Sequence, residues 1–186
     1  NRTATSTGHS YPDATRLIKQ YMSSGALIMN YSGHGSPNSI SHEMVLKLAD
    51  FADATSSKLP LWLTASCDIM PFDGQEDNIG ETALFNPNGG AVAFYGTTRT
   101  VYSTQNELIN RAFMDKVLNL KGNGSAMIGE AVRLAKNELV EKGSDLSANK
   151  LQYSLLGDPA LRLMLPTMKA VVDSIGGVPV DGVSQV

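Results

Sequence analysis

Three short apolar runs alternate with amphipathic segments along the chain. The runs are "ALIMNY" (26–31), "LPLWLTAS" (59–66) and "GAVAFYG" (90–96), and few polar residues interrupt them. Strands that are buried on both faces have this unbroken apolar pattern, whereas strands with one solvated face alternate apolar and polar positions. The runs therefore predict central strands of a sheet that is covered on both sides.

Four segments before, between and after these runs have the 3.6-residue period of helices. We expect them to start after Pro12-Asp13 and end near Gly25, to run from about Ser41 through "KLADFA", to follow "STQNE", and to run onward from Ser125. In the third, Thr104 and Glu107 have the spacing of a capping box. Strands that alternate with helices predict an α/β fold with a mainly parallel sheet.

The residue pattern changes in the last part of the sequence. "LLGDPALRL" predicts a Gly-Asp-Pro turn that leads into a last strand. Beyond Pro166, "MKAVVDSIGGVPVDG" places valines on both sides of a Gly-Gly pair, as in a β-hairpin. We therefore expect residues 1–165 to form the α/β domain and residues 166–186 to start a further β element.

Composition limits which classes of partner the chain can have. The chain has 186 residues, of which 42% are hydrophobic, enough to fill the core of one domain. A net charge of −3 gives no electrostatic case for nucleic acid or an anionic membrane. No apolar run approaches the roughly 18 residues of a membrane-spanning helix. Because the chain begins at Asn1 without a signal peptide, we expect it to be part of a longer protein.

Two reactive side chains follow two of the predicted strands. His34 comes after the first run, in "NYSGHGS", and Cys67, the single cysteine, comes after the second. Sequential strands are usually neighbours, and chemistry in open α/β sheets gathers beyond the carboxyl ends of the strands. An imidazole can convert a thiol into the reactive thiolate. The sequence thus predicts a Cys67–His34 dyad, with the backbone N–H of Gly35 as an oxyanion-hole donor.

Each of these residues also has a purely structural interpretation. A cysteine after a buried strand is often a small core hydrophobe, and a loop histidine is often bonded to backbone. We assign no role to His9 and His42, and we expect no metal site, because neither the histidines nor the lone cysteine has ligand spacing. A cluster of acids could hold calcium, although it lacks EF-hand spacing; it comprises Asp68, Asp73, Glu76, Asp77 and Glu81.

The order of these motifs resembles the gingipain family of caspase-like cysteine peptidases. The matching stretches are "GALIMNYSGHGS", "LTASCD", "GETALFNPNGGAVAFYGTTRTVYS" and "YSLLGDPALRL", which together extend over nearly the whole chain. The resemblance implies a caspase-like three-layer sandwich followed by a β-sandwich. Because "ASCDI" replaces the local caspase signature, cleavage after aspartate is not implied.

The resemblance also assigns roles within the predicted site. It makes Cys67 the nucleophile and His34 the general base and acid, with the backbone N–H groups of Gly35 and Cys67 as the oxyanion hole. It implies no cofactor. Glu81 could support this site, or it could simply begin a helix near the positive end of the helix dipole.

The stretch "GTTRTVYS" corresponds to the loop that lines the specificity pocket in the family. This makes Thr98, Arg99 and Tyr102 candidate substrate-binding residues. Tyr102 could equally pack at the start of a helix. Acidic specificity residues come from a preceding α/β portion in the family, so these motifs do not predict the preferred cleavage site.

Within the family, the motifs are most similar to the C-terminal signal peptidases, or sortases, of the type IX secretion system. This likeness implies an enzyme on the extracellular face of a bacterial outer membrane, which cleaves secretion signals from cargo proteins and transfers the acyl group to a surface glycolipid amine. Its partners would be protein or peptide substrates, other type IX secretion components and surface lipopolysaccharide. The alternatives are a gingipain-type secreted endopeptidase and a catalytically silent scaffold of the secretion machinery.

Overall fold

A four-stranded sheet forms the centre of the molecule. The computed structural model describes residues 3–5, 8–118, 126–165, 174–175 and 178–179. The strand order is β3-β7-β8-β9. Strands β3 (Ile28–Ser32), β7 (Leu61–Ala65) and β8 (Ala93–Thr97) are parallel, and β9 (Tyr153–Leu156) is antiparallel to β8. The three predicted strands and the mainly parallel sheet are thereby confirmed.

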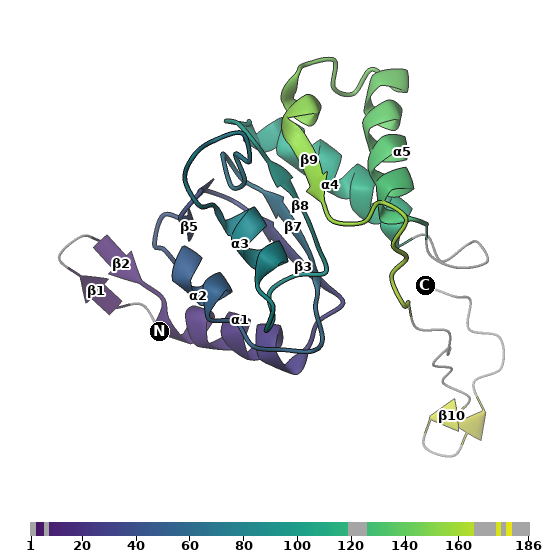
Figure 1. The fold of residues 1–186 in the computed structure, drawn as a ribbon. Helices are drawn as coiled ribbons and strands as arrows, with labels where there is room; N and C mark the ends of the chain where they lie inside the picture. Colours follow the sequence, from purple (N-terminus) through teal and green to yellow (C-terminus); the bar gives the residue numbers. More distant parts are fainter. Residues whose placement is uncertain (1–2, 6–7, 119–125, 166–173, 176–177, 180–186) are drawn as a thin grey trace.

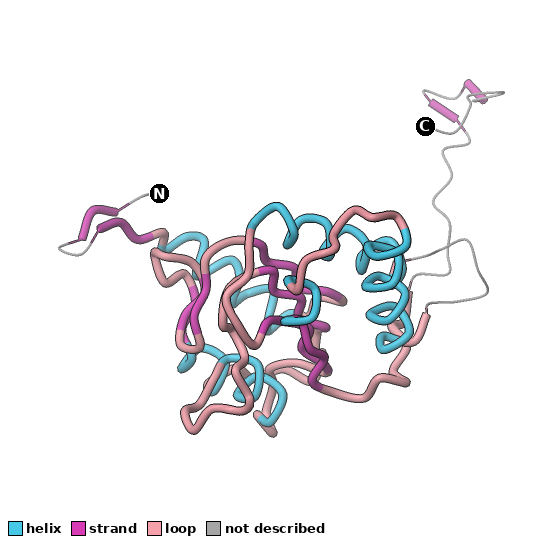
Figure 2. Tube along the Cα trace, turned by 90° about the horizontal axis from the view of Figure 1, so that it is seen from above, coloured by secondary structure: helices cyan, strands magenta, loops and turns pink. Residues whose placement is uncertain are grey.

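Helices cover both faces of this sheet, which gives a three-layer α/β sandwich (Figures 1 and 2). One face carries α1 (Pro12–Ser24), α2 (Leu48–Ala52) and α3 (Ile79–Phe85), and the other carries α4 (Ser103–Val117) and α5 (Ile128–Glu141). Successive side chains along β7 point alternately into the cores on the two faces of the sheet. Leu61 and Leu63 belong to the core under α4 and α5, whereas Trp62 belongs to the core under α1 to α3.

Shorter elements flank the sandwich. A small sheet follows β3 and consists of β4 (Gly35–Ser36), β5 (Ser39–Ile40) and β6 (Leu46–Lys47). The 3₁₀ helix η1 (Asn149–Gln152) leads directly into β9. Two hairpins are formed by β1 (Thr3–Thr5) with β2 (Gly8–Ser10) and by β10 (Ser174–Ile175) with β11 (Val178–Pro179). No helix among the described residues is long and apolar enough to cross a membrane.

The helix expected from about Ser41 was predicted too long. Ser41 and Met44 have φ values of 67° and 52°, which a right-handed helix excludes. Ile40 and Leu46 instead pair across the β5–β6 ladder, and both are buried in the core under α1 to α3. Burial of these two side chains in a ladder outweighs the local helical period, so the helix is confined to α2.

Two further details of the sequence prediction were wrong. α4 begins at Ser103, after an N-cap residue, Tyr102, that makes no side-chain capping bond, so Thr104 does not cap it. The last strand of the sheet, β9, precedes the Gly-Asp-Pro turn rather than following it. Gly157 provides the turn with a φ of 125°, and beyond it the pairing of Arg162 with Met127 is an isolated β-bridge rather than a strand.

The predicted hairpin near the end of the chain is present as far as its strands are described. Residues Ser174 and Ile175 pair with Pro179 and Val178, on either side of the Gly-Gly pair. Residues 166–173, 176–177 and 180–186 lie outside the described residues. The domain boundary near residue 166 and the further β domain therefore stay predictions.

Candidate active site

Neighbouring strands bring His34 and Cys67 to the same edge of the sheet. In the parallel β3–β7 ladder, Ser32 is opposite Ala65, and the Gly33 N–H continues the ladder by donating to the Ala65 carbonyl at 3.2 Å. His34 and Cys67 each lie two residues beyond the last paired position. The predicted pairing of these two strands is confirmed.

The backbone of His34 is held in place while its side chain is exposed. Its carbonyl accepts hydrogen bonds from the Tyr31 hydroxyl and from the Ser41 N–H, both at 2.8 Å. Partial burial, with the negative charge of Glu43, raises the pKa of Tyr31, so the hydroxyl stays protonated and remains a donor. These two hydrogen bonds thus fix the backbone of His34, while its exposed imidazole ring can reach a substrate.

The thiol of Cys67 is half-buried against the backbone of Val101. Its Sγ donates to the Val101 carbonyl at 3.4 Å and accepts from the Val101 N–H at 3.5 Å. The residue after Cys67 also bonds to the loop that contains Val101, because the Asp68 N–H donates to the Arg99 carbonyl at 3.3 Å. Among the described residues, the hydrogen-bond partner of the thiol is therefore the loop after β8, and not the imidazole of His34.

Gly35 packs closely against the segment that follows β7. A Cβ atom at this position would lie 2.7 Å from Ser66 Oγ and 3.0 Å from Ile69 Cδ1. Because the Ser41 N–H donates to the His34 carbonyl, Gly35 and Ile40 are a non-hydrogen-bonded pair of the β4–β5 ladder. The Gly35 N–H consequently points away from β5.

The loop after β8 places the three predicted substrate residues on two sides of Val101. Thr98 donates twice to the Gln152 carbonyl, from its N–H at 2.9 Å and from its Oγ1 at 3.2 Å. Arg99 forms a bidentate ion pair with Asp73, whose pKa the guanidinium lowers. Tyr102 leaves 70% of its surface exposed, so its ring is not packed at the start of α4.

A buried polar network that the motifs did not indicate anchors this loop. The Tyr102 N–H donates to Asn149 Oδ1 at 2.8 Å, and Asn149 Nδ2 donates to Asn106 Oδ1 at 3.2 Å. Asn106 Oδ1 also accepts from the Tyr153 hydroxyl at 2.7 Å. The available signal was Asn106 itself, a polar residue on the apolar stripe of α4 that also carries Ile109 and Phe113.

The predicted acidic cluster separates into individual interactions. Asp73 pairs with Arg99, Asp68 accepts from Thr100 Oγ1 at 3.0 Å, and Glu81 bonds to Asn78, the N-cap of α3. No group of three or more His, Cys, Asp or Glu residues that could hold a metal ion occurs in the described ranges. The calcium hypothesis finds no support in this arrangement, and Glu81 takes part in the start of α3.

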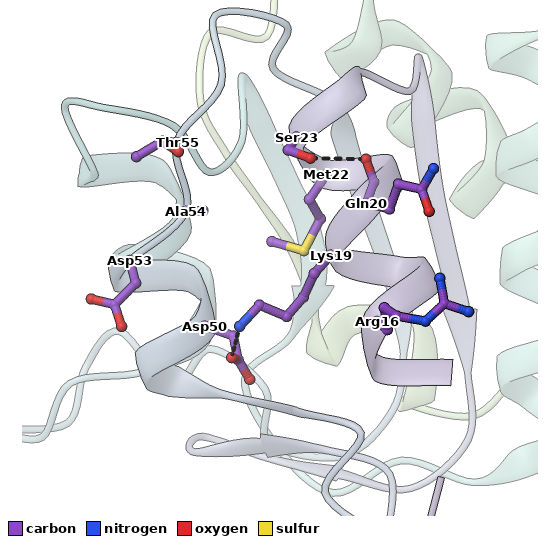
Figure 3. Close-up of a pocket in the computed structure, with 9 residues that line it drawn as sticks. All are labelled: Arg16, Lys19, Gln20, Met22, Ser23, Asp50, Asp53, Ala54 and Thr55. Atoms are coloured by element: carbon purple, nitrogen blue, oxygen red, sulfur yellow. Dashed lines mark hydrogen bonds and ion pairs between the residues drawn. The ribbon is translucent and has the colours of Figure 1, made fainter. Parts of the chain in front are cut away.

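Hollows in the surface occur both near the thiol and away from it. One, of about 490 Å³, is bordered by Thr100 and Tyr102, the two neighbours of Val101. Another, of about 400 Å³, lies between α1 and α2 (Figure 3), where Lys19 pairs with Asp50 at 2.7 Å. Ser23 near the end of α1 lines the second hollow, and α1 leads into the amino end of β3, so this hollow is remote from His34 and Cys67.

Known structures share this fold. Gingipain R, an Arg-specific cysteine proteinase, superposes with a TM-score of 0.70 at 21% sequence identity over 83% of this chain. The complex of the Porphyromonas gingivalis RgpB pro- and mature domains gives a TM-score of 0.59 at 18% identity over 80% of this chain. The chain spans only 36% and 37% of the length of these two proteins. These likenesses establish the caspase-like fold of the sandwich.

Sequence comparison identifies the family. No curated protein sequence matches the chain significantly. The family model of peptidase family C25 matches residues 1–164, which include both strand ends and the loop after β8. The chain therefore belongs to peptidase family C25, the gingipain family of cysteine peptidases.

Proposed function

We propose that this chain carries the catalytic residues of a cysteine peptidase, with Cys67 as nucleophile and His34 as general base and acid. The observation that carries the proposal is the placement of a thiol and an exposed imidazole two residues beyond a shared ladder, in a member of peptidase family C25. Membership of this family also supports proteins or peptides as substrates.

The reaction follows from the chemistry of these groups. His34 removes the thiol proton after Cys67 Sγ leaves Val101, and the thiolate attacks the scissile carbonyl. The N–H groups of Gly35 and Cys67 are the proposed donors to the resulting oxyanion. As the C–N bond breaks, His34 returns the proton to the leaving amine and a thioester remains. Water or a second amine then attacks the thioester and releases the thiol.

For the physiological role, the sortase reading is favoured by the stretch "NPNGGAVAFYGTTRTVYS", which resembles PorU, the C-terminal signal peptidase of the type IX secretion system. In this role the enzyme acts at the extracellular face of the outer membrane and passes cargo to a surface glycolipid amine. The fold similarity to gingipain R supports a secreted endopeptidase equally well, so this is the second candidate.

A first experiment tests the dyad in the full-length protein. Alkylation of Cys67 by iodoacetamide is followed from pH 5 to pH 9 in the wild type and in His34→Ala. If His34 activates the thiol, the variant should react more slowly at mildly acidic pH. His42→Ala, which removes another exposed histidine, is the matched control and should react like the wild type. A pH profile that His34→Ala leaves unchanged would show that the thiol is structural.

A second experiment separates the physiological roles in cells. With Cys67→Ala, the sortase role predicts that cargo proteins keep their C-terminal signal and are not attached to surface polysaccharide. Normal trimming and attachment in this variant would refute that role. Efficient hydrolysis of unrelated proteins by the purified wild type would favour the endopeptidase. A secretion defect on deletion of the gene, but not with Cys67→Ala, would indicate the silent scaffold.

A further inference from the structure

We propose that Thr97, the last residue of β8, is a positioning residue whose buried hydroxyl directs the backbone N–H of Cys67 toward the oxyanion. The inference rests on the proposed function, in which this N–H is one of the two donors to the oxyanion. Thr97 acts through the peptide group that joins Ser66 to Cys67 and not on the reacting atoms themselves. The sequence motifs assign no role to this residue.

The Thr97 hydroxyl donates to the Ser66 carbonyl in the interior of the molecule. The donor atom is Oγ1, and neither residue has exposed surface. The paired positions of the β7–β8 ladder end at Leu63 and Tyr95, so the contact at Ser66 lies beyond the ladder and is made by a side chain. A buried carbonyl requires a partner of this kind.

The geometry of a trans peptide group carries this contact to the Cys67 N–H. The carbonyl and the N–H of such a group lie in one plane and point in opposite directions. Because β7 lies between β3 and β8 (Figure 1), a Ser66 carbonyl held toward β8 turns the Cys67 N–H toward the side of β3. Gly35, which carries the other proposed donor, follows β3 and packs against Ser66. Thr97 therefore directs one donor toward the segment that carries the other.

The bond before this peptide group supports the same orientation. The Ala65 carbonyl accepts from the Gly33 N–H at 3.2 Å, so it points toward β3. The next carbonyl, that of Ser66, points to the opposite side, toward Thr97. The chain thus remains extended up to the nucleophile, and the Cys67 N–H points to the same side of β7 as the Ala65 carbonyl.

Thr97 is itself held firmly. It pairs with Tyr153 in the β8–β9 ladder, and its carbonyl accepts from the Met70 N–H at 3.0 Å. One residue thereby bonds to the chain both before and after Cys67. The β-branched side chain also has few χ1 rotamers, which fixes the direction of its hydroxyl. A donor that is preorganised in this way needs no rearrangement when the oxyanion forms.

Replacement of Thr97 by valine tests this role in the full-length protein at nearly constant side-chain volume. Thr97→Val should lower kcat for peptide cleavage about tenfold, less than the roughly 10²–10³-fold cost of losing a whole oxyanion donor. KM should change by less than about twofold, because the N–H acts mainly in the transition state. Thr97→Ser keeps the hydroxyl and should retain most of the activity.

Alkylation by iodoacetamide separates this role from activation of the thiol. In that reaction the Cys67 sulfur displaces iodide from a CH₂ carbon, and no carbonyl is converted into an oxyanion. Thr97→Val should therefore be alkylated at the wild-type rate, whereas His34→Ala should react more slowly. Equal losses of alkylation rate and kcat in Thr97→Val would show that Thr97 supports the thiol or the fold instead, and would overturn the proposal.

Thr64→Val is the matched control. Thr64 is fully buried on β7, and its hydroxyl has no hydrogen-bond partner within the described ranges. The variant removes a buried hydroxyl of the same kind and should keep the wild-type kcat. A similar loss of kcat in Thr64→Val, or a Thr97→Ser variant as slow as Thr97→Val, would refute the role of the Thr97 hydroxyl.

An NMR measurement reads the same peptide group without turnover. Labelling with carbonyl-¹³C serine and ¹⁵N cysteine selects Ser-Cys peptide groups, and the signal that Cys67→Ala removes belongs to Ser66 and Cys67. Loss of the hydrogen bond in Thr97→Val should move the Ser66 carbonyl signal upfield, and Thr64→Val should not.

The two readouts distinguish failure of this inference from failure of the proposed function. If the carbonyl signal moves but the wild type cleaves no peptide, the orientation by Thr97 stands and the proposed catalytic function fails. If the wild type cleaves peptides and Thr97→Val leaves kcat unchanged, only the role of Thr97 is refuted, whether or not the signal moves.

Discussion

At the scale of single residues, the packing of Gly35 against Ser66 limits how closely the segment with His34 approaches the segment with Cys67. Ser66 Oγ is buried and has no hydrogen-bond partner among the described residues. It lies where a Cβ of residue 35 would point, at 2.7 Å. Packing requires a small residue at 35, whereas the hydroxyl at 66 adds an unsatisfied polar atom.

Replacement of Ser66 by Ala should therefore not destabilise the protein. Removal of an unpaired buried hydroxyl avoids its desolvation cost, and we expect the free energy of unfolding to stay constant or rise by about 1 kcal/mol. Urea unfolding of the wild type and the variant measures this difference. A loss above roughly 1 kcal/mol would show that the hydroxyl has a favourable partner.

Gly35→Ala should lower the free energy of unfolding by about 1–3 kcal/mol, because the added methyl group overlaps Ser66 and Ile69. Ser66→Gly removes two of the overlapping atoms. The double variant should recover part of the loss, which a double-mutant cycle detects as coupling between the two positions. Strictly additive effects would contradict the close approach.

At the scale of elements, single side chains join helix ends that are distant in sequence. Asn86 follows α3, and its Nδ2 donates to the carbonyls of Phe51, Ala52 and Ala54 at 2.9, 3.1 and 2.8 Å. These carbonyls lie at and after the end of α2, where the helix itself supplies no donors. The amide therefore closes α2 and fixes it beside α3.

Asn86→Ala should lower the free energy of unfolding by about 1.5–3 kcal/mol, because it leaves these carbonyls short of donors. Thermal unfolding compares it with Asn88→Ala. Asn88 is exposed, and its backbone, which the substitution retains, supplies its contacts with Ser56 and Asn86. The control should remain close to the wild type, and equal losses in both variants would show that Asn86 is not a specific cap.

At the scale of the whole molecule, the core under α4 and α5 contains two buried phenols. The rings of Tyr95 and Tyr153 lie 5.6 Å apart between centroids, and each is about 1% exposed or less. Burial raises the pKa of Tyr95, and burial with the nearby Tyr95 and Cys67 raises the pKa of Tyr153. In the folded state both phenols thus stay protonated above the range in which unfolded tyrosines ionise.

The free energy of unfolding should fall as the pH rises above about 10. Below the unfolded pKa both states bind the phenolic protons, whereas above it the unfolded state releases them first and is favoured. Each tyrosine contributes a slope of up to about 1.4 kcal/mol per pH unit. Tyr95→Phe removes a hydroxyl that lacks a partner among the described residues, and should reduce the slope by up to about 1.4 kcal/mol per pH unit. Tyr21→Phe, at an exposed tyrosine, should leave it unchanged.

The sequence by itself determined the central strands, helices α1, α4 and α5 to within a few residues, and the two strand ends that carry His34 and Cys67. These features are local, because an unbroken apolar run or a helical period reflects the environment of one segment. The family resemblance added the caspase-like arrangement. It did not reveal that α2 is short, since that depends on the burial of Ile40 and Leu46 in a ladder.

Only the tertiary structure decided what surrounds the thiol. Cys67 is hydrogen-bonded to Val101, and Tyr102 to Asn149, across sequence separations of 34 and 47 residues. These contacts follow from the pairing of β7 with β8 and of β8 with β9, in which the antiparallel β9 brings η1 to the carboxyl edge of the sheet. A sequence pattern specifies which face of a segment is buried, but the partner of that face is set by packing between distant segments.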